Sequence, residues 1–494
     1  MRPRTLADVT VIGGGLAGSE AAWQAARRGA SVVLYEMRPH VRGPAHQTGM
    51  LAELVCSNSM RGMALENAVG LLKEELARLD SLIITSARET AVPAGGALAV
   101  DRERFGALVE SRLGALPNVE IRREEITAIP SEGTVIIACG PLPSEPLAAA
   151  IDALVGGRLH YYDAAAPIVA LDSIDTSVMY RKSRYDKGDG DDYLNIPLDR
   201  ETYVRFVEDL RSLPKHEPHG FEEDAAGGDV PYFEGCLPIE EMARRGEDAL
   251  RYGPLKPVGL RDPRTGRGPY AVVQLRNENA AGTALNLVGF QTRLTWPAQK
   301  EAFAKLPGLA DAEWLRLGVM HRNTFIDSPR LLGADLRLRS APRILFAGQI
   351  TGAEGYVEAA ACGTIAGIGV ARAATGLPAV TVPADTALGA IVAHLQNTAT
   401  PDFQPANVTW TYFTPLDETI RDKRARRARL AERALAKIDA FAAAVAPATG
   451  SRRRLVVSVA GVVVRPEERT VQAVVADAVD AMFLPPPAGG GAQH

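Results

Sequence analysis

The chain has few cysteines, and their spacing excludes several kinds of site. It contains four among 494 residues, Cys56, Cys139, Cys236 and Cys362, and no two of them form a CxxC pair. Zinc sites and dithiol redox centres need clustered thiols, and a disulfide framework needs a much higher cysteine content. The sequence therefore argues against all three, and we expect no bound metal.

A large net charge and a long apolar run are also missing. With 55 basic and 59 acidic residues the net charge is −4, so any nucleic-acid contact must come from a local basic patch. The longest apolar run, Leu455–Val464, is too short to span a bilayer, and the N-terminus does not resemble a signal peptide. We therefore expect a cytoplasmic protein without membrane contacts.

A dinucleotide-binding motif lies at the N-terminus. The β-branched run Val9–Ile12 predicts a buried parallel strand, which ends in the GxGxxG turn Gly13–Gly18. An alanine-rich helix follows and ends before Gly29, and a second strand, Ser31–Tyr35, leads to Glu36. This order of strand, turn, helix, strand and acid is typical of a Rossmann βαβ unit.

Each part of this motif has a physical task. Gly13 permits the tight turn, Gly15 lets the backbone approach a pyrophosphate, and Gly18 allows the helix to pack on the strand. The helix N-terminus supplies N–H groups to phosphates, and the Glu36 carboxylate is placed to bind ribose hydroxyls.

Two later segments favour FAD over NAD as the bound dinucleotide. Thr134–Gly140 and Arg343–Gln349 resemble strand elements of FAD enzymes, with Gln349 where many flavoproteins carry Asp. No second GxGxxG unit is present, so NADH or NADPH is expected to visit the flavin only transiently. The predicted FAD-binding residues are Gly13, Gly14, Gly15, Leu16, Ala17, Gly18, Glu36, Gly348, Gln349, Gly355 and Tyr356.

The predicted architecture is α/β, with a discontinuous Rossmann-like FAD-binding domain interrupted by an inserted α+β domain. The expected segments are the first FAD-binding part (1–155), the insertion (156–324), the second FAD-binding part (325–380), a helical basic segment (381–450) and a partly disordered extension (451–494). The basic helix, Ile420–Lys437, is either a solvated face or an RNA contact, and its charge alone does not decide between the two.

Several longer motifs resemble one family, the folate- and FAD-dependent tRNA (uracil-5-)-methyltransferases. Together they extend from about Val9 to about Lys437. The matching segments are Leu54–Ser59, Val92–Asp101, Tyr180–Lys187, Tyr232–Glu240, Gly253–Leu260, Gly318–Phe325, Phe346–Gly352 and Phe403–Val408. The chain departs from the pattern at Ile196, where relatives often have cysteine, and beyond about Arg452.

The resemblance implies a specific reaction and a set of cofactors. Such an enzyme transfers a one-carbon unit from methylenetetrahydrofolate to carbon 5 of the T-loop uridine in tRNA. Reduced FAD supplies the electrons that turn methylene into methyl, and NADH or NADPH restores the flavin.

This chemistry requires a thiol, because carbon 5 of uracil becomes nucleophilic only after a thiolate adds to carbon 6. Cys139 and Cys362 lie in an apolar strand and an alanine-rich helix, so we interpret both as small core residues. Cys56 and Cys236 lie in polar or glycine-containing contexts that suit an accessible thiol. By resemblance these two are the functional pair; we favour Cys236 as nucleophile and Cys56 as its partner near the flavin.

The remaining candidate residues would bind substrates. His321 and Arg322 could hold the folate glutamate or a phosphate, serve in proton transfer, or simply stabilise a turn. The candidate RNA contacts are Arg421, Lys423, Arg424 and Arg427. Three other functions stay open: the same chemistry on ribosomal RNA, a small-molecule flavin oxidoreductase, and an RNA-binding module with a structural flavin. The target RNA is not readable from a motif.

Overall fold

The structure is a computed structural model that describes residues 7–43, 45–157, 159–164, 166–216, 237–318, 320–399, 403–447, 458–459 and 462–463. The chain divides into two units, residues 1–446 and 447–494. In the second unit the structure describes Pro447 and two short strands, β17 (Ser458–Val459) and β18 (Val462–Val463), which form an antiparallel pair.

The first lobe of the larger unit, here called the flavin lobe, contains a five-stranded parallel sheet. Its order is β16-β7-β1-β2-β6, so the N-terminal strand is central and the late strand β16 returns beside β7. The sequence prediction of a Rossmann-like fold is confirmed. The strands are β1 (Val9–Ile12), β2 (Val32–Tyr35), β6 (Val119–Arg122), β7 (Thr134–Ile137) and β16 (Ile344–Phe346).

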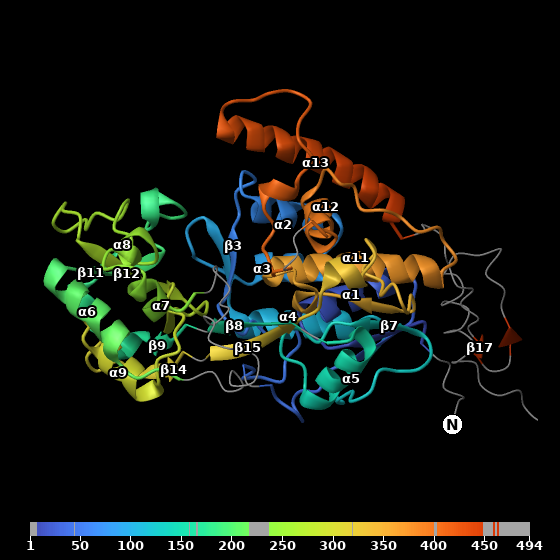
Figure 1. Ribbon diagram of the computed structural model, residues 1–494, viewed down its shortest axis with the longest axis horizontal. Coiled ribbons are helices and arrows are strands. Elements are labelled where there is room, and N and C mark those ends of the chain that lie inside the picture. Colours follow the sequence, from blue (N-terminus) through green and yellow to red (C-terminus); the bar gives the residue numbers. More distant parts are fainter. Residues whose placement is uncertain are drawn as a thin grey trace, which may run out of the picture. The chain divides into compact units, whose positions relative to one another are not determined.

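Two helices pack against each other in the core of the flavin lobe. α1 (Leu16–Arg27) and α11 (Tyr356–Ala374) lie side by side in Figure 1. The lobe also contains α2 (Ala68–Arg78), α3 (Leu82–Glu89), α4 (Arg102–Gly114), α5 (Glu145–Val155), α10 (Ser328–Leu331) and a small sheet of β3 (Ser59–Gly62), β5 (Ala97–Val100) and β4 (Ala91–Val92).

By length and composition α11 could cross a membrane, but 78% of its apolar window is buried inside the protein. Its apolar residues form part of the same core as α1, so α11 is the central helix of a folded lobe.

The second lobe, here called the insertion lobe, has its own sheet and core. The sheet has the order β10-β11-β12-β13-β9-β14, and all its strand pairs are antiparallel. Its core includes the packed rings of Phe206, Phe290 and Phe303. The elements are β9 (Ile168–Ala170), β10 (Tyr180–Arg181), β11 (Tyr193–Leu198), β12 (Ala271–Asn277), β13 (Ala284–Leu287), β14 (Trp314–Arg316), α6 (Arg200–Ser212), α7 (Ile239–Arg244), α8 (Ala249–Tyr252) and α9 (Trp296–Ala304).

The chain passes between the two lobes through one antiparallel strand pair, β8 (Leu159–Ala164) and β15 (Met320–Phe325). Hydrogen bonds also join the lobes: Asn58 Nδ2 donates to Asn277 O over 2.9 Å, and Gly95 N donates to Asp192 Oδ2 over 2.6 Å. The division into five segments that the sequence suggested stays a prediction.

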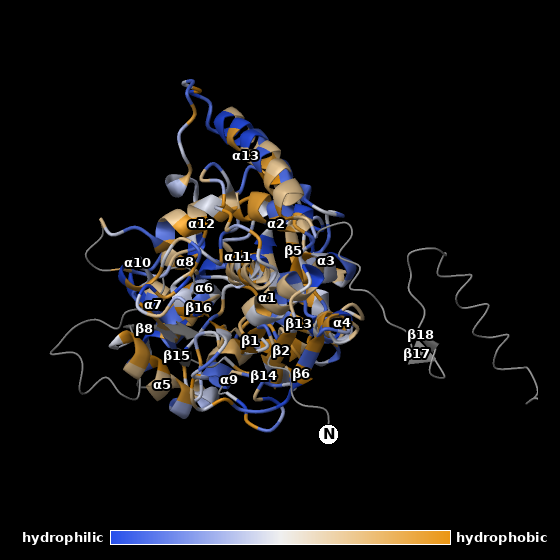
Figure 2. Cartoon of the chain, turned by 90° about the vertical axis from the view of Figure 1, so that its right-hand side faces the viewer, coloured by the Kyte–Doolittle hydropathy of each residue, from blue (hydrophilic) through white to orange (hydrophobic). Residues whose placement is uncertain are grey.

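The C-terminal helices complete the core of the flavin lobe. α12 (Ala387–Leu395) and α13 (Lys423–Val445) both contribute side chains to the core that contains α1 and α11. α13 begins at Lys423 because Asp422 caps it, accepting Ala425 N at 2.7 Å. Its buried residues begin only at Leu430, so its first two turns contribute nothing to the core; Figure 2 shows this end as hydrophilic.

We predict opposite effects for the same substitution at two glycines of α11. A Cβ at Gly367 would lie 2.5 Å from Ala21 O, whereas a Cβ at Gly369 would meet nothing within 4 Å. Gly367→Ala should therefore separate α1 from α11 and lower stability by about 1–3 kcal/mol. Gly369→Ala should raise it by about 0.5–1 kcal/mol, because alanine is the better helix former.

Thermal unfolding of the two variants and the native chain measures the difference. A Gly367→Ala variant as stable as Gly369→Ala would mean that the close contact between these helices does not constrain the fold.

Candidate active site

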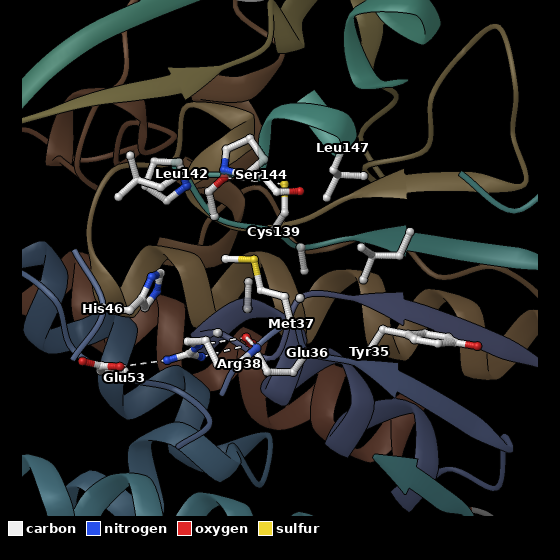
Figure 3. A pocket seen from close by; sticks show the side chains of 18 of the residues that line it. Tyr35, Glu36, Met37, Arg38, His46, Glu53, Cys139, Leu142, Ser144 and Leu147 are labelled. Atoms are coloured by element: carbon white, nitrogen blue, oxygen red, sulfur yellow. Dashed lines mark hydrogen bonds and ion pairs between the residues drawn. The ribbon is translucent and has the colours of Figure 1, made fainter. Parts of the chain in front are cut away.

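A pocket lies beyond the carboxyl ends of the parallel strands of the flavin lobe, where open α/β sheets bind ligands. It contains about 980 Å³ of empty space, part of which is open solvent. Figure 3 shows the side chains that line it. Of the predicted cofactor-binding residues it contacts Gly13, Gly15, Leu16, Ala17, Glu36, Gln349 and Tyr356.

The three motif glycines have different surroundings. Gly13 has a φ of +102°, and a Cβ there would lie 2.5 Å from Ala138 O. A Cβ at Gly18 would lie 1.8 Å from Gly13 O, so the start of α1 packs directly on the turn. At Gly15, by contrast, a Cβ would meet nothing within 4 Å and would stand in the pocket. Gly13 and Gly18 are thus required by the fold, and Gly15 leaves space beside the helix N-terminus for a ligand.

A buried group of charges forms one end of the pocket (Figure 3). Glu36 accepts hydrogen bonds from Gly14 N over 2.9 Å and from Arg38 N, Nε and Nη2 over 2.8–3.0 Å. Arg38 also pairs with Glu53 over 2.9 Å. Burial opposes ionisation of Glu36, but the hydrogen bonds and charge of Arg38 outweigh it and hold the pKa of Glu36 below its usual value. Ribose binding by Glu36 stays a proposal.

His46 leaves an unsatisfied polar atom in this part of the pocket. Burial, and next the charge of Arg38, lower the pKa of its imidazole. Its Nδ1 is buried and has no hydrogen-bond partner among the described residues. Since buried polar atoms are almost always paired, a polar ligand group at this position would satisfy it.

The other end of the pocket lies at the N-terminus of α11. Gln349 donates to both oxygens of Glu354 over 2.7 Å, and Tyr356 is the first residue of the helix. Gly348 and Gly355 have φ values of +87° and +112° and shape the turns on either side. Neither of these glycines lines the pocket, and the same holds for Gly14 and Gly18.

Cys56 is half-buried and held beside this helix end. The Tyr356 hydroxyl oxygen accepts hydrogen bonds from Cys56 N over 2.8 Å and from Ser57 N over 3.1 Å. Burial, and next the neighbouring Cys56, raise the pKa of Tyr356 above its usual value, so its hydroxyl stays protonated at neutral pH. The preceding residue, Val55, lines the pocket.

Two guanidinium groups converge on the backbone before Cys56. Arg102 donates to Leu54 O and pairs with Glu278 over 2.8 Å; Arg316, from β14, donates to Val55 O over 2.7 Å. Within the described part of the chain Arg316 has no carboxylate partner, and the Nε atoms of both arginines are buried without an acceptor. Burial, and next the charge of Arg102, lower the pKa of Arg316. The lobe junction therefore places two guanidinium groups next to Cys56, and of these only Arg102 pairs with a described carboxylate.

The other described cysteines, Cys139 and Cys362, differ in burial. Cys362 is fully buried, and burial raises the pKa of its thiol to about 11, as suits a core residue. Cys139 packs against a hydrophobic cluster of the core, as expected, but it is only half-buried and also lines the pocket. The reason is that β7 ends at Ile137, so Cys139 lies past the strand at the sheet edge where ligands bind. Cys236 lies outside the described residues.

The predicted substrate residues are not brought together with Cys56 by any described contact. The backbone of His321 and Arg322 lies in β15. Arg421 and Lys423 are exposed at the start of α13, Arg424 pairs with Glu66 over 3.3 Å, and the Arg427 guanidinium lies 6.0 Å from the Trp410 ring centre. Among the described residues no group of His, Cys, Asp and Glu is arranged to hold a metal ion.

Comparison with known proteins identifies the family. The family model described as "Glucose inhibited division protein A" matches residues 8–378. The chain is 57% identical over 441 residues to the methylenetetrahydrofolate–tRNA-(uracil-5-)-methyltransferase TrmFO of Pelobacter propionicus, covering 89% of this chain and 96% of that protein.

The chain belongs to the TrmFO family. It is equally similar, at 57% identity, to the protein of the same name from Geobacter sulfurreducens, covering 88% of this chain and 99% of the relative. The crystal structure of Aquifex aeolicus GidA has a TM-score of 0.65 at 17% identity and covers 89% of this chain and 74% of that one, which shows a shared fold.

The residues of the pocket fit the FAD of this family. The space at Gly15, the N–H groups at the start of α1 and the unsatisfied His46 Nδ1 are features that a dinucleotide would use. Sequence reasoning missed Arg38, His46, Arg102 and Arg316. None of these four stands in a motif with a fixed chemical meaning, and only folding brings them to the pocket and to Cys56.

We predict that Gly15→Val removes FAD without unfolding the chain. The side chain would enter open space in the ligand-free fold, so stability should change little, but it would block the approach of the pyrophosphate. Flavin absorbance of the purified variant measures the loss, and circular dichroism reports the fold.

Gly18→Val is the matched control, because its side chain would collide with Gly13 O and should disrupt the fold itself. Normal flavin content in a folded Gly15→Val variant would show that this turn does not bind the cofactor.

Proposed function

We propose that this chain methylates carbon 5 of a uridine in the T-loop of tRNA, with methylenetetrahydrofolate as the one-carbon donor and FAD as the redox cofactor. The observation that carries the proposal is the 57% identity to proteins named for this activity, matched over 96–99% of their length. The pocket described above supplies a site for the flavin. Because the RNA substrate is intracellular, we also propose a cytoplasmic location.

The FAD site is formed by the Gly13–Gly18 turn, Glu36 and the Gln349–Tyr356 segment. When bound, FAD reduced by NADH or NADPH supplies the two electrons that convert the transferred methylene into a methyl group. The start of α11 directs its positive end towards this part of the pocket, which favours added negative charge there.

The protein thiols activate the uracil ring. In our proposal the Cys236 thiolate forms a bond to carbon 6, and the electrons of the C5–C6 double bond move to the O4 oxygen as an enolate. Carbon 5 then attacks the methylene carbon of the folate. Loss of the C5 proton and cleavage of the bond between the methylene carbon and the folate nitrogen release tetrahydrofolate and leave an exocyclic methylene on carbon 5. Addition of a hydride to that methylene carbon, with the two electrons that FAD would supply when bound, forms the methyl group; the C6–S bond breaks at the same time, which restores the ring and frees the thiolate.

Cys56 is proposed to act beside the flavin. Its backbone is fixed by Tyr356, and Arg102 and Arg316 place positive charge next to it. Such charge in a poorly solvated junction can offset negative charge that develops on reacting oxygen or sulfur atoms. His321 and Arg322 stay candidates for holding folate or phosphate groups.

We predict that the native chain transfers label from methylenetetrahydrofolate to unmodified tRNA in the presence of NADPH, and that Cys236→Ala and Cys56→Ala both abolish the transfer. Each variant should retain FAD, and flavin reduction by NADPH should persist because hydride transfer needs no thiol. Cys362→Ala is the control and should cost only about 1 kcal/mol of stability.

Mapping the labelled nucleotide tests the T-loop assignment, and label in ribosomal RNA alone would replace tRNA as the substrate. RNA with 5-fluorouridine identifies the nucleophile, because fluorine does not leave as a proton does and the covalent adduct persists. An adduct that forms equally well with Cys236→Ala would move the nucleophile to another residue.

The first turns of α13 are proposed to contact RNA phosphates. Lys423 and Arg426 are exposed and have no carboxylate partner within the described ranges, whereas Arg429 pairs with Glu418 and Glu432. Cations with no internal partner are available for phosphate binding.

We predict that replacing Lys423 and Arg426 by Gln weakens tRNA binding and lowers the slope of log Kd against log salt by about one per lost phosphate contact. Fluorescence anisotropy over a salt series measures the slope. Arg429→Gln is the control and should change it less. An unchanged slope in the double variant would mean that this helix end is only a solvated face.

A further inference from the structure

An exposed aromatic ring stands on the loop that follows β10 in the insertion lobe. Tyr185 is 59% exposed, and Val258, two residues before Leu260, is 53% exposed on the neighbouring loop. Tyr185 lies outside the flavin pocket and has no part in the thiol chemistry. A large exposed ring in a folded loop loses the stabilisation that burial would give it. Such exposure is typical of a residue that contacts a ligand or a partner.

The backbone at this ring is strained. Tyr185 and Asp186 have φ values of +59° and +54°, the left-handed region that residues other than glycine rarely adopt. Two such residues in succession are energetically unfavourable, and they persist only where the surrounding structure fixes them.

Several hydrogen bonds fix this conformation. Tyr185 N donates to Gly259 O over 3.2 Å, and Asp186 N donates to Ser183 O over 3.1 Å. Arg184 lies beneath the loop and donates to the carbonyl oxygens of Val258 and Lys256. These hydrogen bonds fix the Tyr185 loop to the rest of the insertion lobe. The ring therefore does not lie on a free loop.

The Tyr185 ring packs against Gly259. The φ of Gly259 is +82°, and a Cβ there would lie 2.7 Å from Tyr185 Cε1, so the ring rests directly on the glycine backbone. With one side held in this way and 59% of the residue exposed, the ring is presented to solvent in a fixed orientation. A rigid ring with an open side is what base stacking requires, because little conformational freedom is lost on binding.

The surroundings of the ring carry unpaired positive charge. The exposed cations without a carboxylate partner, among described residues, are Arg181, Lys187, Lys256 and Arg261. The exposed carboxylates are Asp186, which pairs with Lys182, and Asp189 and Asp191. Cations therefore exceed free carboxylates here. The loop also reaches the flavin lobe, since a Cβ at Gly96 would lie 3.5 Å from Lys187 Cδ.

We propose that Tyr185 is a stacking platform for an unpaired base of the substrate RNA, with the surrounding lysines and arginines binding the adjoining phosphates. This inference rests on the proposed function and extends it to a second RNA contact, separate from the start of α13. Sequence-tolerant stacking on an aromatic ring flanked by cations is how proteins hold single-stranded loops.

The test compares Tyr185→Ala and Tyr185→Phe with the native FAD-containing protein in binding a fluorescein-labelled, unmodified tRNA transcript. Tyr185→Ala should weaken binding by about 5- to 150-fold, the range for loss of one stacked base. Tyr185→Phe should bind within about twofold of native, because the ring face is what stacks. Neither variant should change the salt slope, since no charge is removed; this separates stacking from phosphate binding.

Tyr252→Ala is the matched control, because Tyr252 is 80% exposed on α8 of the same lobe and should leave binding unchanged. Tyr185→Ala binding as tightly as native would overturn the inference while leaving the proposed function intact. If Tyr185→Ala changes the sedimentation coefficient of the protein but leaves tRNA binding unchanged, the ring is a contact between copies of the chain. That result would also overturn the inference. A native chain that neither binds tRNA nor transfers label to it would overturn both.

Discussion

The close approach of α1 and α11 is the constraint on which the site depends. A Cβ at Gly363 would lie 2.2 Å from Ala17 O, and one at Gly348 would lie 2.6 Å from Ala17 Cβ, so only glycine allows these backbones to meet. α1 begins at the dinucleotide turn and α11 begins at Tyr356. Their contact therefore fixes the two ends of the pocket relative to each other, including the end that holds Cys56.

Charge is arranged differently at the two ends of this site. At the Glu36 end Arg38 pairs with both Glu36 and Glu53, so each buried charge has an opposite partner. At the Cys56 end Arg316 has only a carbonyl oxygen as partner within the described residues. Buried charges without partners are costly, so they are retained where a ligand or a reaction supplies the opposite charge. The paired charges around Arg38 shape the pocket. The unpaired charge of Arg316 is suited to stabilising negative charge that develops in a reaction.

The parts of the site that the sequence predicted well are those encoded by local geometry. The strand, the GxGxxG turn and Glu36 lie within one βαβ unit, and their backbone conformation depends on residue type. Cys139 shows the limit of such reasoning: an apolar context predicted a core residue, but the strand ends two residues earlier and the side chain faces the pocket. The basic helix was predicted from Ile420 to Lys437, yet only the core packing reveals that α13 residues before Leu430 contribute nothing to the hydrophobic core.

The amino-acid sequence was enough to predict the Rossmann-like fold and the family, because these depend on periodicity, glycine conformation and long shared motifs. Which distant side chains meet depends instead on the packing of the folded chain. Arg102 and Arg316 are 214 positions apart in the numbering yet reach consecutive carbonyl groups beside Cys56. The Tyr185 ring is held by Gly259 in another loop. Such contacts depend on how the two lobes and their loops pack, and no local pattern encodes that packing.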